Sequence, residues 1–549
     1  MPLVSFDYKD FIHLLGYDIP KERLIERLPM IGGDFSHAEG DEINIEFFPN
    51  RPDLTSVEGI ARASRAFFGY KTGLQTYPLH PSDITLRVEA SVKPIRPFVT
   101  TALVKNIQIT DELIVSLMGL QEKLHIGLGR NRKKVAIGVH NAEPVTPPFT
   151  YKAVDPDVVS FVPLAKDESM TLREILHRHE KGIGYAHLLA SYSKYPLIVD
   201  AHDNVLSFPP IINGTLTEVT PDTKNIFIDV TGTDRKAINY ALNIVTTALA
   251  ERGGTIYQTT VLDEGKKLVS PDLTPQKQQV SVADVNRILG TRLKDKEVAT
   301  YLKMMGYNAT KGKQGSLLVE VPAWRSDILH EIDLIEDVAV GYGFDRFETD
   351  FPKALTFGGT LAHHNLHERV RSVMIGLGYN EVTTFVISNE KDETLRLGLP
   401  QTNMVEIENP IGEEYSILRV SLLPSLLKLL RENRHHPLPQ QIFEVGVVVD
   451  HQAKNQHRLA GMKIDAKAHF TECKAVVETV MRECGEKLII KEAMHPAFID
   501  GRCATVTHNG MDVGVFGELH PRTIQEFSLE HPVIAFELEI DVLARTTSV

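Results

Sequence analysis

The spacing of hydrophobic residues predicts alternating strands and helices near the start of the chain. Glu42–Phe48 (EINIEFF) alternates polar and apolar residues, as a half-buried strand does. A helix is predicted next, because Thr55 and Glu58 have the spacing of a capping box ahead of an apolar face. These elements define a first domain, residues 1–88, in which the proline-containing stretch 78–81 is expected to be a linker.

The middle of the chain predicts an α+β domain over residues 89–265. Runs typical of strands alternate with two longer runs whose apolar residues recur at helical spacing. The second of these helices is predicted to stop at Gly253 and Gly254. The strands are expected at 92–109, 134–145, 195–214 and 225–234, and the helices at 170–190 and 235–254.

Two further domains are predicted after this one. Residues 266–347 indicate two short helices, a strand and a third helix, which suits a small winged or helix-turn-helix-like module. Residues 348–549 carry many strands and few helices, which favours an antiparallel sheet with flanking helices. The apolar run Ser421–Leu430 is equally consistent with core and with an interface helix. The predicted fold class is therefore α+β and multidomain.

Composition excludes several classes of protein. With 42% hydrophobic and 24% charged residues, the 549-residue chain is expected to be globular rather than disordered. No apolar run approaches the roughly 18 residues that a membrane span needs, and the first residues lack the features of a signal peptide. Three scattered cysteines form neither a disulfide framework nor a paired-cysteine metal site, so a cytoplasmic location is expected.

The charge pattern limits how the chain can bind nucleic acid. A net charge of −13 argues against a surface that binds phosphates on all sides. One basic strip is present, and by itself it is best interpreted as a solvated loop between strands. Its residues are Arg130, Arg132, Lys133 and Lys134. The common catalytic patterns, including a phosphate-binding loop, a nucleophile elbow and an HExxH motif, are missing from the sequence.

An acidic cluster is the first candidate for a chemical role. Asp333, Glu336 and Asp337 are spaced i, i+3 and i+4, so they share one face of a predicted helix, and Asp327 lies just ahead. Converging carboxylates repel one another unless a cation lies between them, and Mg²⁺ prefers such oxygen ligands. Acidic residues are also common at helix starts because they interact favourably with the helix dipole. The spacing supports these two interpretations about equally.

A second candidate is a group of small hydrogen-bonding side chains in residues 205–234. A pocket lined by such groups can recognise a polar substituent on a ring and can position water. The alternative is ordinary strand and turn chemistry with hydroxyl groups facing solvent, and the residues alone favour it because exposed threonine is common on strands. The residues are Asn213, Thr215, Thr217, Asp229, Thr231 and Thr233.

Seven sequence strings change the weight of these alternatives. In chain order they are FFPNRPDLTSVEGIARA, SFPPIING, DVTGTD, VPAWRSDILHEIDLIEDVAVGYGF, ENPIGEEYSILRVSLLPSLL, IFEVG and FGELHP. Each string is modestly specific. Their order and spacing over essentially the whole chain resemble the beta subunits of phenylalanyl-tRNA synthetases, in the shorter archaeal and eukaryotic-cytosolic form.

The resemblance implies a metal site at the acidic cluster. The family binds Mg²⁺ through acidic residues in the stretch that here is SDILHEIDLIED. These positions are Asp327, Asp333, Glu336 and Asp337. The resemblance thus favours the metal interpretation over the helix-dipole interpretation.

The resemblance also implies an editing pocket in the domain that carries SFPPIING and DVTGTD. Such a pocket hydrolyses tyrosine wrongly attached to the tRNA for phenylalanine. A site that hydrogen-bonds the extra hydroxyl group discriminates better than one that only excludes it sterically. We expect Asp229 and Thr231 to contact the substrate, and Ser207 and Asn213 to line the pocket. No residue there is a typical nucleophile, so hydrolysis would use a positioned water and the ribose hydroxyl of the tRNA.

The last domain resembles the class II synthetase fold but lacks its arginine-bearing glycine motif, so it is expected to be catalytically silent. Arg419 lies near the place of a motif-two arginine, without the usual acidic partner. The resemblance implies a separate alpha subunit that binds phenylalanine and ATP, a tetramer of two alpha and two beta chains, and contacts with the tRNA for phenylalanine.

Three alternative functions remain open from the sequence. The first is a non-catalytic RNA-binding or scaffold protein on a retired synthetase fold. The second is a free-standing deacylase, which would leave the large silent domain without a purpose. The third is an Mg²⁺-dependent phosphohydrolase, which would need a phosphate-binding loop near Asp327, and none is visible in the sequence.

Overall fold

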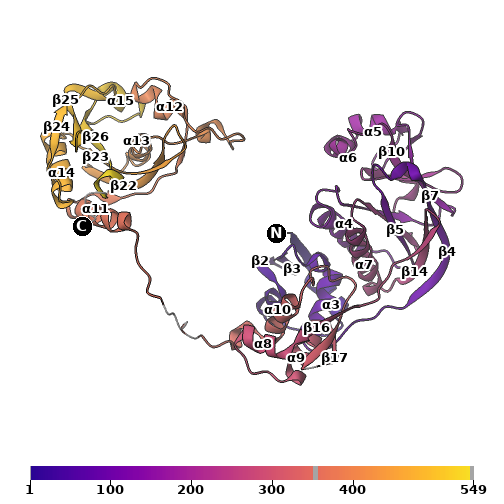
Figure 1. Cartoon of the computed structure of the whole chain (residues 1–549). Coiled ribbons are helices and arrows are strands. Elements are labelled where there is room, and N and C mark those ends of the chain that lie inside the picture. Colours follow the sequence, from indigo (N-terminus) through magenta and orange to yellow (C-terminus); the bar gives the residue numbers. More distant parts are fainter. Residues whose placement is uncertain (1, 314, 350, 352–355, 545–549) are drawn as a thin grey trace. The chain divides into compact units, whose positions relative to one another are not determined.

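The computed structural model describes residues 2–313, 315–349, 351 and 356–544 (Figure 1). The chain divides into two compact units, residues 1–350 and 351–549. Among the described residues, no helix has both the length and the apolar character needed to cross a membrane.

Ten strands of the described part of the first unit form one large sheet. β13 (Ile226–Gly232) lies inside it and pairs antiparallel with β5 (Phe98–Lys105) and β6 (Val135–Asn141). Every residue of β13 is buried, since its two faces pack into two different cores. The strand predicted at 225–234 is therefore confirmed. The other strands are β4 (Leu79–Val88), β7 (Phe149–Val154), β10 (Tyr195–Val199), β11 (Val205–Phe208), β12 (Ile212–Asn213), β14 (Thr255–Asp263) and β15 (Lys266–Ser270).

Two helices, α4 (Asp111–Ile126) and α7 (Arg235–Glu251), cover one face of this sheet (Figure 1). α7 corresponds to the helix predicted at 235–254, whereas α4 has no counterpart in the sequence analysis. Its start nevertheless carries a recognisable cap, because Thr110 Oγ1 accepts a hydrogen bond from the backbone N–H of Leu113 at 3.3 Å.

The helix predicted at 170–190 is divided into α5 (Leu172–Arg178) and α6 (Glu180–Tyr185). The break comes at His179, which has an extended backbone. His179 Nδ1 then accepts a hydrogen bond from the N–H of Lys181 and caps the second helix.

The large sheet extends beyond both ends of residues 89–265. Residues 78–81, expected to be a linker, instead run into β4, which pairs in parallel with β14. Pro81 lies opposite Gln258, beside a shift in register where a missing backbone N–H is tolerated. At the other end, β15 pairs with β14.

One hydrophobic core joins the predicted first and third domains. Buried residues between Val4 and Phe67 pack with buried residues between Val280 and Val338. Each segment provides a three-stranded sheet, and both sheets contribute buried residues to this core. Of the second sheet only β18 was predicted, since β16 and β17 are mostly polar. The elements are β1 (Leu3–Asp7), α1 (Tyr8–Leu15), β2 (Gly33–Glu39), β3 (Glu42–Phe47), α3 (Val57–Phe67), β16 (Gln276–Ser281), α8 (Val282–Leu289), α9 (Asp295–Met304), β17 (Asn308–Lys311), β18 (Ser316–Val321) and α10 (Glu331–Tyr342).

The predicted capping box at Thr55 and Glu58 is wrong. The cap of α3 is Ser56, whose Oγ accepts a hydrogen bond from the N–H of Gly59 at 3.3 Å. Glu58 is buried, and its carboxylate accepts a hydrogen bond from Arg252 Nε at 2.7 Å. The glutamate therefore ties α3 to the end of α7 instead of capping its own helix.

In the second unit, seven strands form one sheet within residues 356–544, in the order β19-β22-β23-β27-β26-β25-β24. All neighbours are antiparallel except β19 and β22, which agrees with the predicted antiparallel sheet. The strands are β19 (Asn380–Glu381), β22 (Gln440–Val449), β23 (Asn455–Ile464), β24 (Ile489–Glu492), β25 (Phe498–His508), β26 (Met511–Leu519) and β27 (Val533–Glu539).

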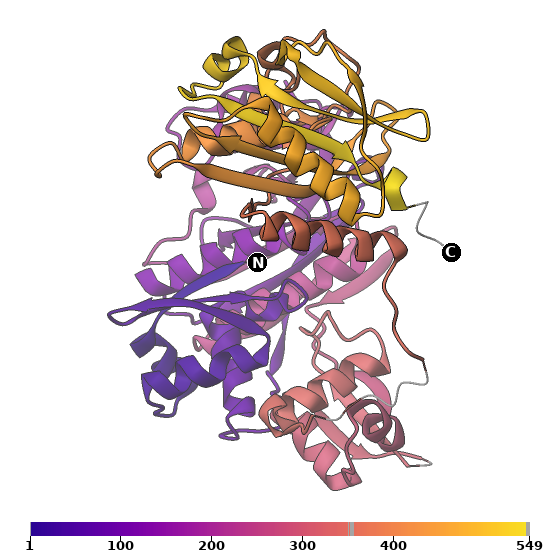
Figure 2. The same ribbon diagram turned by 90° about the vertical axis from the view of Figure 1, so that its left-hand side faces the viewer.

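Helices cover both faces of this second sheet. α11 (Ala362–Gly376) and α14 (Phe470–Glu483) lie side by side in one core, as Figure 2 shows. α13 (Leu423–Glu432) belongs to the other core, because alternate residues of each strand point to opposite faces. The leucines of α13 are buried in that core, so the run Ser421–Leu430 is core packing and not an exposed interface helix.

Candidate functional site

A cavity of about 560 Å³ lies beside β13 in the first unit. Its walls come from α4, β6, β13, α6 and the turn that follows β11, and its volume is that of a typical small-molecule site. The structure brings all four predicted pocket residues to this cavity: Ser207, Asn213, Asp229 and Thr231. Of these, Ser207, Asp229 and Thr231 are buried, so the alternative in which these groups face bulk solvent is wrong for them.

Asp229 is held by a chain of hydrogen bonds. Its Oδ2 accepts from His140 Nε2 at 2.7 Å and from Ser207 Oγ at 3.4 Å. The other ring nitrogen, His140 Nδ1, lies 2.8 Å from Thr217 Oγ1. Because a carboxylate only accepts hydrogen bonds, Nε2 donates to Asp229, while Nδ1 and the Thr217 hydroxyl share the second hydrogen bond. Both the imidazole and the carboxylate are buried, so their relative orientation is fixed.

Sequence reasoning missed His140 and the residue that makes room for it, Gly138. Both lie on β6 two residues apart, so they occupy the same face of the sheet. A Cβ atom on Gly138 would lie 2.1 Å from Asp229 Oδ2 and 2.6 Å from His140 Nε2. The available signal was a single glycine inside an apolar strand, which often marks a close approach of other groups.

Thr231 is held by a buried arginine. Arg96 Nε donates to Thr231 Oγ1 at 2.9 Å, and Arg96 Nη2 donates to the carbonyl oxygen of Thr231 at 2.7 Å. Burial lowers the pKa of Arg96 to about 10, against the opposing effects of Tyr151 and Asp229. The Thr231 oxygen is thus used as an acceptor, which leaves its hydroxyl hydrogen free to donate.

A second charged group lines the cavity along α4. His125 Nδ1 lies 3.6 Å from Glu122 Oε2, and its Nε2 accepts a hydrogen bond from the N–H of Ile137 at 2.8 Å. Contact with His125, followed by the charges of Arg132 and Lys181, lowers the pKa of Glu122 to about 2. Burial lowers the pKa of His125. The cavity lining also includes Glu180 and Glu218, and two of its four carboxylates, Asp229 and Glu122, thus lie in different surroundings.

Arg132 was expected to lie in a solvated loop, and for this residue the expectation is wrong. It is buried and lines the cavity, where its Nη1 donates to the carbonyl oxygen of Ile211 at 2.8 Å and its guanidinium stacks over the Tyr185 ring at 4.4 Å. Arg130, Asn131 and Arg132 have φ values of 48°, 52° and 66°, which cost roughly 1–2 kcal/mol for each residue with a side chain. Contacts of Arg132 with the cavity wall offset this strain.

Three of the four carboxylates of the acidic cluster make hydrogen bonds to protein groups, and the four do not converge on one point, as metal ligands would. Arg325 donates to Asp327 at 2.8 and 2.7 Å and to Asp337 at 2.7 Å, and Asp333 accepts from two backbone N–H groups at the start of α10. Partial burial, followed by the charges of Asp337, Asp333 and Asp327, raises the pKa of Glu336. Within the described residues, no three of these carboxylates bring their oxygens within 4.8 Å of one another. By themselves they fit ion pairs and a helix cap better than a Mg²⁺ ligand set.

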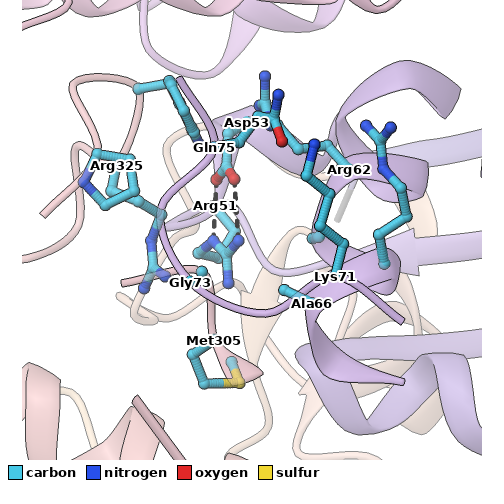
Figure 3. Close-up of a pocket in the computed structure, with 14 residues that line it drawn as sticks. Arg51, Asp53, Arg62, Ala66, Lys71, Gly73, Gln75, Met305 and Arg325 are labelled. Atoms are coloured by element: carbon cyan, nitrogen blue, oxygen red, sulfur yellow. Dashed lines mark hydrogen bonds and ion pairs between the residues drawn. The ribbon is translucent and has the colours of Figure 1, made fainter. Parts of the chain in front are cut away.

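Arg325 also borders a small cavity of about 30 Å³ (Figure 3). Arg51 there donates two hydrogen bonds of 2.9 Å to Asp53, and Arg62 stacks over the Trp324 ring at 4.3 Å. These residues come from segments far apart in the sequence, and the cavity has room for only about one water molecule. The arginines that line it therefore have a structural role, since they hold these segments of the first unit together.

Comparisons with known proteins agree with the arrangement of the chain. The family model for the phenylalanyl tRNA synthetase beta chain CLM domain matches residues 347–540, and the model for the tRNA synthetase B5 domain matches residues 278–344. A crystal structure of an N-terminal fragment of the phenylalanyl-tRNA synthetase beta subunit from Pyrococcus horikoshii is similar, with a TM-score of 0.60 and 36% identity. It covers 62% of this chain and 100% of the fragment.

Full-length relatives are similar over almost the whole chain. The phenylalanine–tRNA ligase beta subunit of Methanothrix thermoacetophila is 46% identical over 99% of this chain and 100% of its own length. That of Archaeoglobus fulgidus is 43% identical over 100% of this chain and 99% of its own length. The chain therefore belongs to the family of phenylalanine–tRNA ligase beta subunits.

Proposed function

We propose that this chain works with a separate alpha subunit as a phenylalanine–tRNA ligase, and that its own cavity removes tyrosine from mischarged tRNA for phenylalanine. The alpha subunit would bind ATP and phenylalanine and attach the amino acid, in a tetramer of two alpha and two beta chains. The observation that carries the editing proposal is the position of Asp229, a buried carboxylate that lines a cavity large enough for an aminoacyl group.

Asp229 has the chemistry to distinguish tyrosine from phenylalanine. Both hydrogen bonds from protein groups fall on Oδ2, and no hydrogen bond to Oδ1 occurs among the described residues. A phenol hydroxyl donating to Oδ1 would satisfy that oxygen, whereas a phenylalanine ring would displace water and leave it unpaired. Sites built in this way discriminate by roughly 10⁴–10⁵-fold. Leu117, Ile137 and Val139 provide apolar lining for the ring itself.

Hydrolysis in this proposal uses water and not a protein nucleophile. Ser207 lies in the cavity, but within the described residues its Oγ makes only a long hydrogen bond of 3.4 Å to Asp229 and none to a histidine or lysine, so no strong base activates its oxygen. Thr231, whose hydroxyl hydrogen is free, and the amide of Asn213 can orient a water molecule or the ester carbonyl. The ribose hydroxyl next to the ester would assist the attacking water.

The direct test uses the complex of this chain with its alpha subunit and tRNA for phenylalanine carrying tyrosine. Release of tyrosine by the wild type, and its loss in Asp229→Ala with phenylalanine charging unchanged, would support the proposal. Asp157→Ala is the matched control, because Asp157 is an exposed carboxylate of the same unit, paired only with Arg173 and outside the cavity. If Asp229→Ala clears tyrosine as fast as the control, the cavity is not the editing site.

The second unit supports the proposal that the synthetase-like domain is catalytically silent. Arg419 is only 1% exposed. Its Nε, Nη1 and Nη2 donate to Val447 O, Thr384 Oγ1 and Glu444 Oε1 at 2.9, 2.6 and 2.8 Å. Three of its five N–H donors are thus used inside the fold, and burial keeps the guanidinium away from the solvent from which a nucleotide phosphate would bind. This unit would instead provide assembly with the alpha subunit and contacts with tRNA.

Mg²⁺ at Asp327, Asp333, Glu336 and Asp337 is proposed from the family resemblance alone. The carboxylates of this chain do not form a complete ligand set, since Arg325 and a helix cap already engage three of them. An ion there would need water or groups from a partner as further ligands. Titration of the complex with Mg²⁺ tests this: Glu336→Gln should weaken binding, and equal binding by that variant would remove Glu336 from the site.

The alternative of a non-catalytic RNA-binding scaffold predicts no deacylation by either the chain or the complex. The buried cavity with its fixed carboxylate favours the editing proposal over this alternative, because a scaffold has no need for a desolvated charge.

A further inference from the structure

Three histidines and an aspartate meet in the second unit, far in sequence from the sites described above. His363 and His367 lie one turn apart on α11, His457 is near the start of β23, and Asp541 begins α16 (Asp541–Ala544). The ring centres are 4.7 Å apart for His367 and His457, and 5.4 Å apart for His363 with either of the others. Imidazoles that share one tetrahedral ion, with bonds of about 2.0 Å, have ring centres roughly 5 Å apart.

His457 is oriented by a carboxylate. Its Nδ1 lies 3.1 Å from Asp541 Oδ1 and 3.2 Å from Oδ2, and its backbone N–H donates to Asp541 Oδ2 at 3.0 Å. Nitrogen and oxygen ligands of one tetrahedral ion, with bonds of about 2.0 Å, lie roughly 3.3 Å apart. The spacing of Nδ1 and the carboxylate therefore suits two ligands of the same ion.

The surroundings of His367 give separate evidence for a ligand at this site. The side chain is 7% exposed, and its Nε2 has no hydrogen-bond partner among the described residues. A buried ring nitrogen without a partner is costly unless something else satisfies it.

We propose that His367, His457 and Asp541 bind a divalent transition-metal ion of the zinc class, with His363 as the nearest fourth ligand. One ligand atom from each of the first three residues lies within 4.8 Å of the others. Imidazole nitrogen favours Zn²⁺, Co²⁺ or Ni²⁺ over Mg²⁺, which prefers oxygen ligands, so this site differs in chemistry from the acidic cluster of the first unit. A bound ion would join α11 to α16 and to the start of β23, and so fix both ends of the described second unit.

The test uses the full-length chain in complex with its alpha subunit, without a histidine tag and stripped of metal. Titration with Co²⁺ should produce the intense visible absorption band of a four-coordinate ion at one equivalent per beta chain, and Zn²⁺ should abolish that band. His367→Ala and His457→Ala should lose the band, and Asp541→Asn should weaken Zn²⁺ binding about 10–100-fold.

His364→Ala is the matched control, because His364 is an exposed histidine on the same helix beside His363. It should bind Co²⁺ and Zn²⁺ as the wild type does. The proposal fails if the wild-type complex shows no such band, or if His364→Ala weakens binding as much as His367→Ala. The wild-type titration decides the question even if a substituted chain does not fold.

Discussion

Asp229 Oδ2 lies 2.7 Å from Nε2 of His140, and both side chains are buried beside the large cavity of the first unit. The two residues come from neighbouring strands, β13 and β6, and Asp229 is paired with Gly138 in the sheet register. Because Gly138 has no side chain, His140 and Asp229 can come into contact beside it.

Removing the histidine should disable editing. In His140→Gln the side chain is shorter and loses its contact with either Asp229 or Thr217, so a buried group is left unsatisfied at a cost of about 1–3 kcal/mol. We expect slower release of tyrosine from mischarged tRNA and a lower free energy of unfolding in urea. The exposed His177→Gln should change neither measurement. Normal deacylation by His140→Gln would show that the pair is structural only.

Adding one methyl group should have a similar effect. In Gly138→Ala the new Cβ would lie 2.1 Å from Asp229 Oδ2, so the carboxylate or the strand has to move, at about 1–3 kcal/mol. Deacylation should fall while phenylalanine charging by the complex stays normal. Gly184→Ala is the control, since nothing lies within 4 Å of its added Cβ. Equal deacylation by the two variants would contradict the crowding argument.

Thr231→Val should destabilise the chain through Arg96. Valine has nearly the same shape but cannot accept the hydrogen bond from Arg96 Nε, so a buried guanidinium loses a partner. The expected loss in free energy of unfolding is about 1–3 kcal/mol. Thr231→Ser should restore most of it, and the exposed Thr233→Val should have little effect. A loss of the same size in the serine variant would point to packing and not to the hydroxyl group.

A buried glutamate in the second unit should make stability depend on pH. Burial raises the pKa of Glu393 from its ordinary 4.5 to about 7, although its Oε2 accepts hydrogen bonds from the N–H groups of Val420 and Ser421. The folded state then binds the proton more tightly than the unfolded state does. The protonated Glu393 therefore contributes its full stabilisation below about pH 4.5. This contribution is lost as the pH rises through 7, and the free energy of unfolding falls by about 3 kcal/mol in total.

Glu393→Gln has no charge to lose, so its free energy of unfolding should fall less than that of the wild type between pH 5 and about pH 8. Urea unfolding at several pH values measures this difference. Glu390→Gln, at an exposed position of the same short helix, should keep the wild-type pH dependence. Parallel curves for Glu393→Gln and the wild type would show that Glu393 is not the titrating group.

Some elements could be predicted because their pattern is local. The helix at 235–251 and the strand at 226–232 follow from hydrophobic spacing and from caps within a few residues. The polar strands β16 and β17 could not be predicted, since their pairing with β18 and their share of the core depend on residues far away in the sequence. The helix α4 could have been found from its cap and its leucine spacing.

The sequence by itself determined which family the chain resembles, and it named Asp229, Thr231, Ser207 and Asn213 as one group, because ordered strings of residues carry that information. Only the tertiary structure decided what surrounds them. His140, Gly138 and Arg96 lie on other strands or loops, and their hydrogen bonds and close contacts depend on sheet register. Periodicity along the chain predicts which face a side chain takes within its own strand, but not which side chain of another strand it meets.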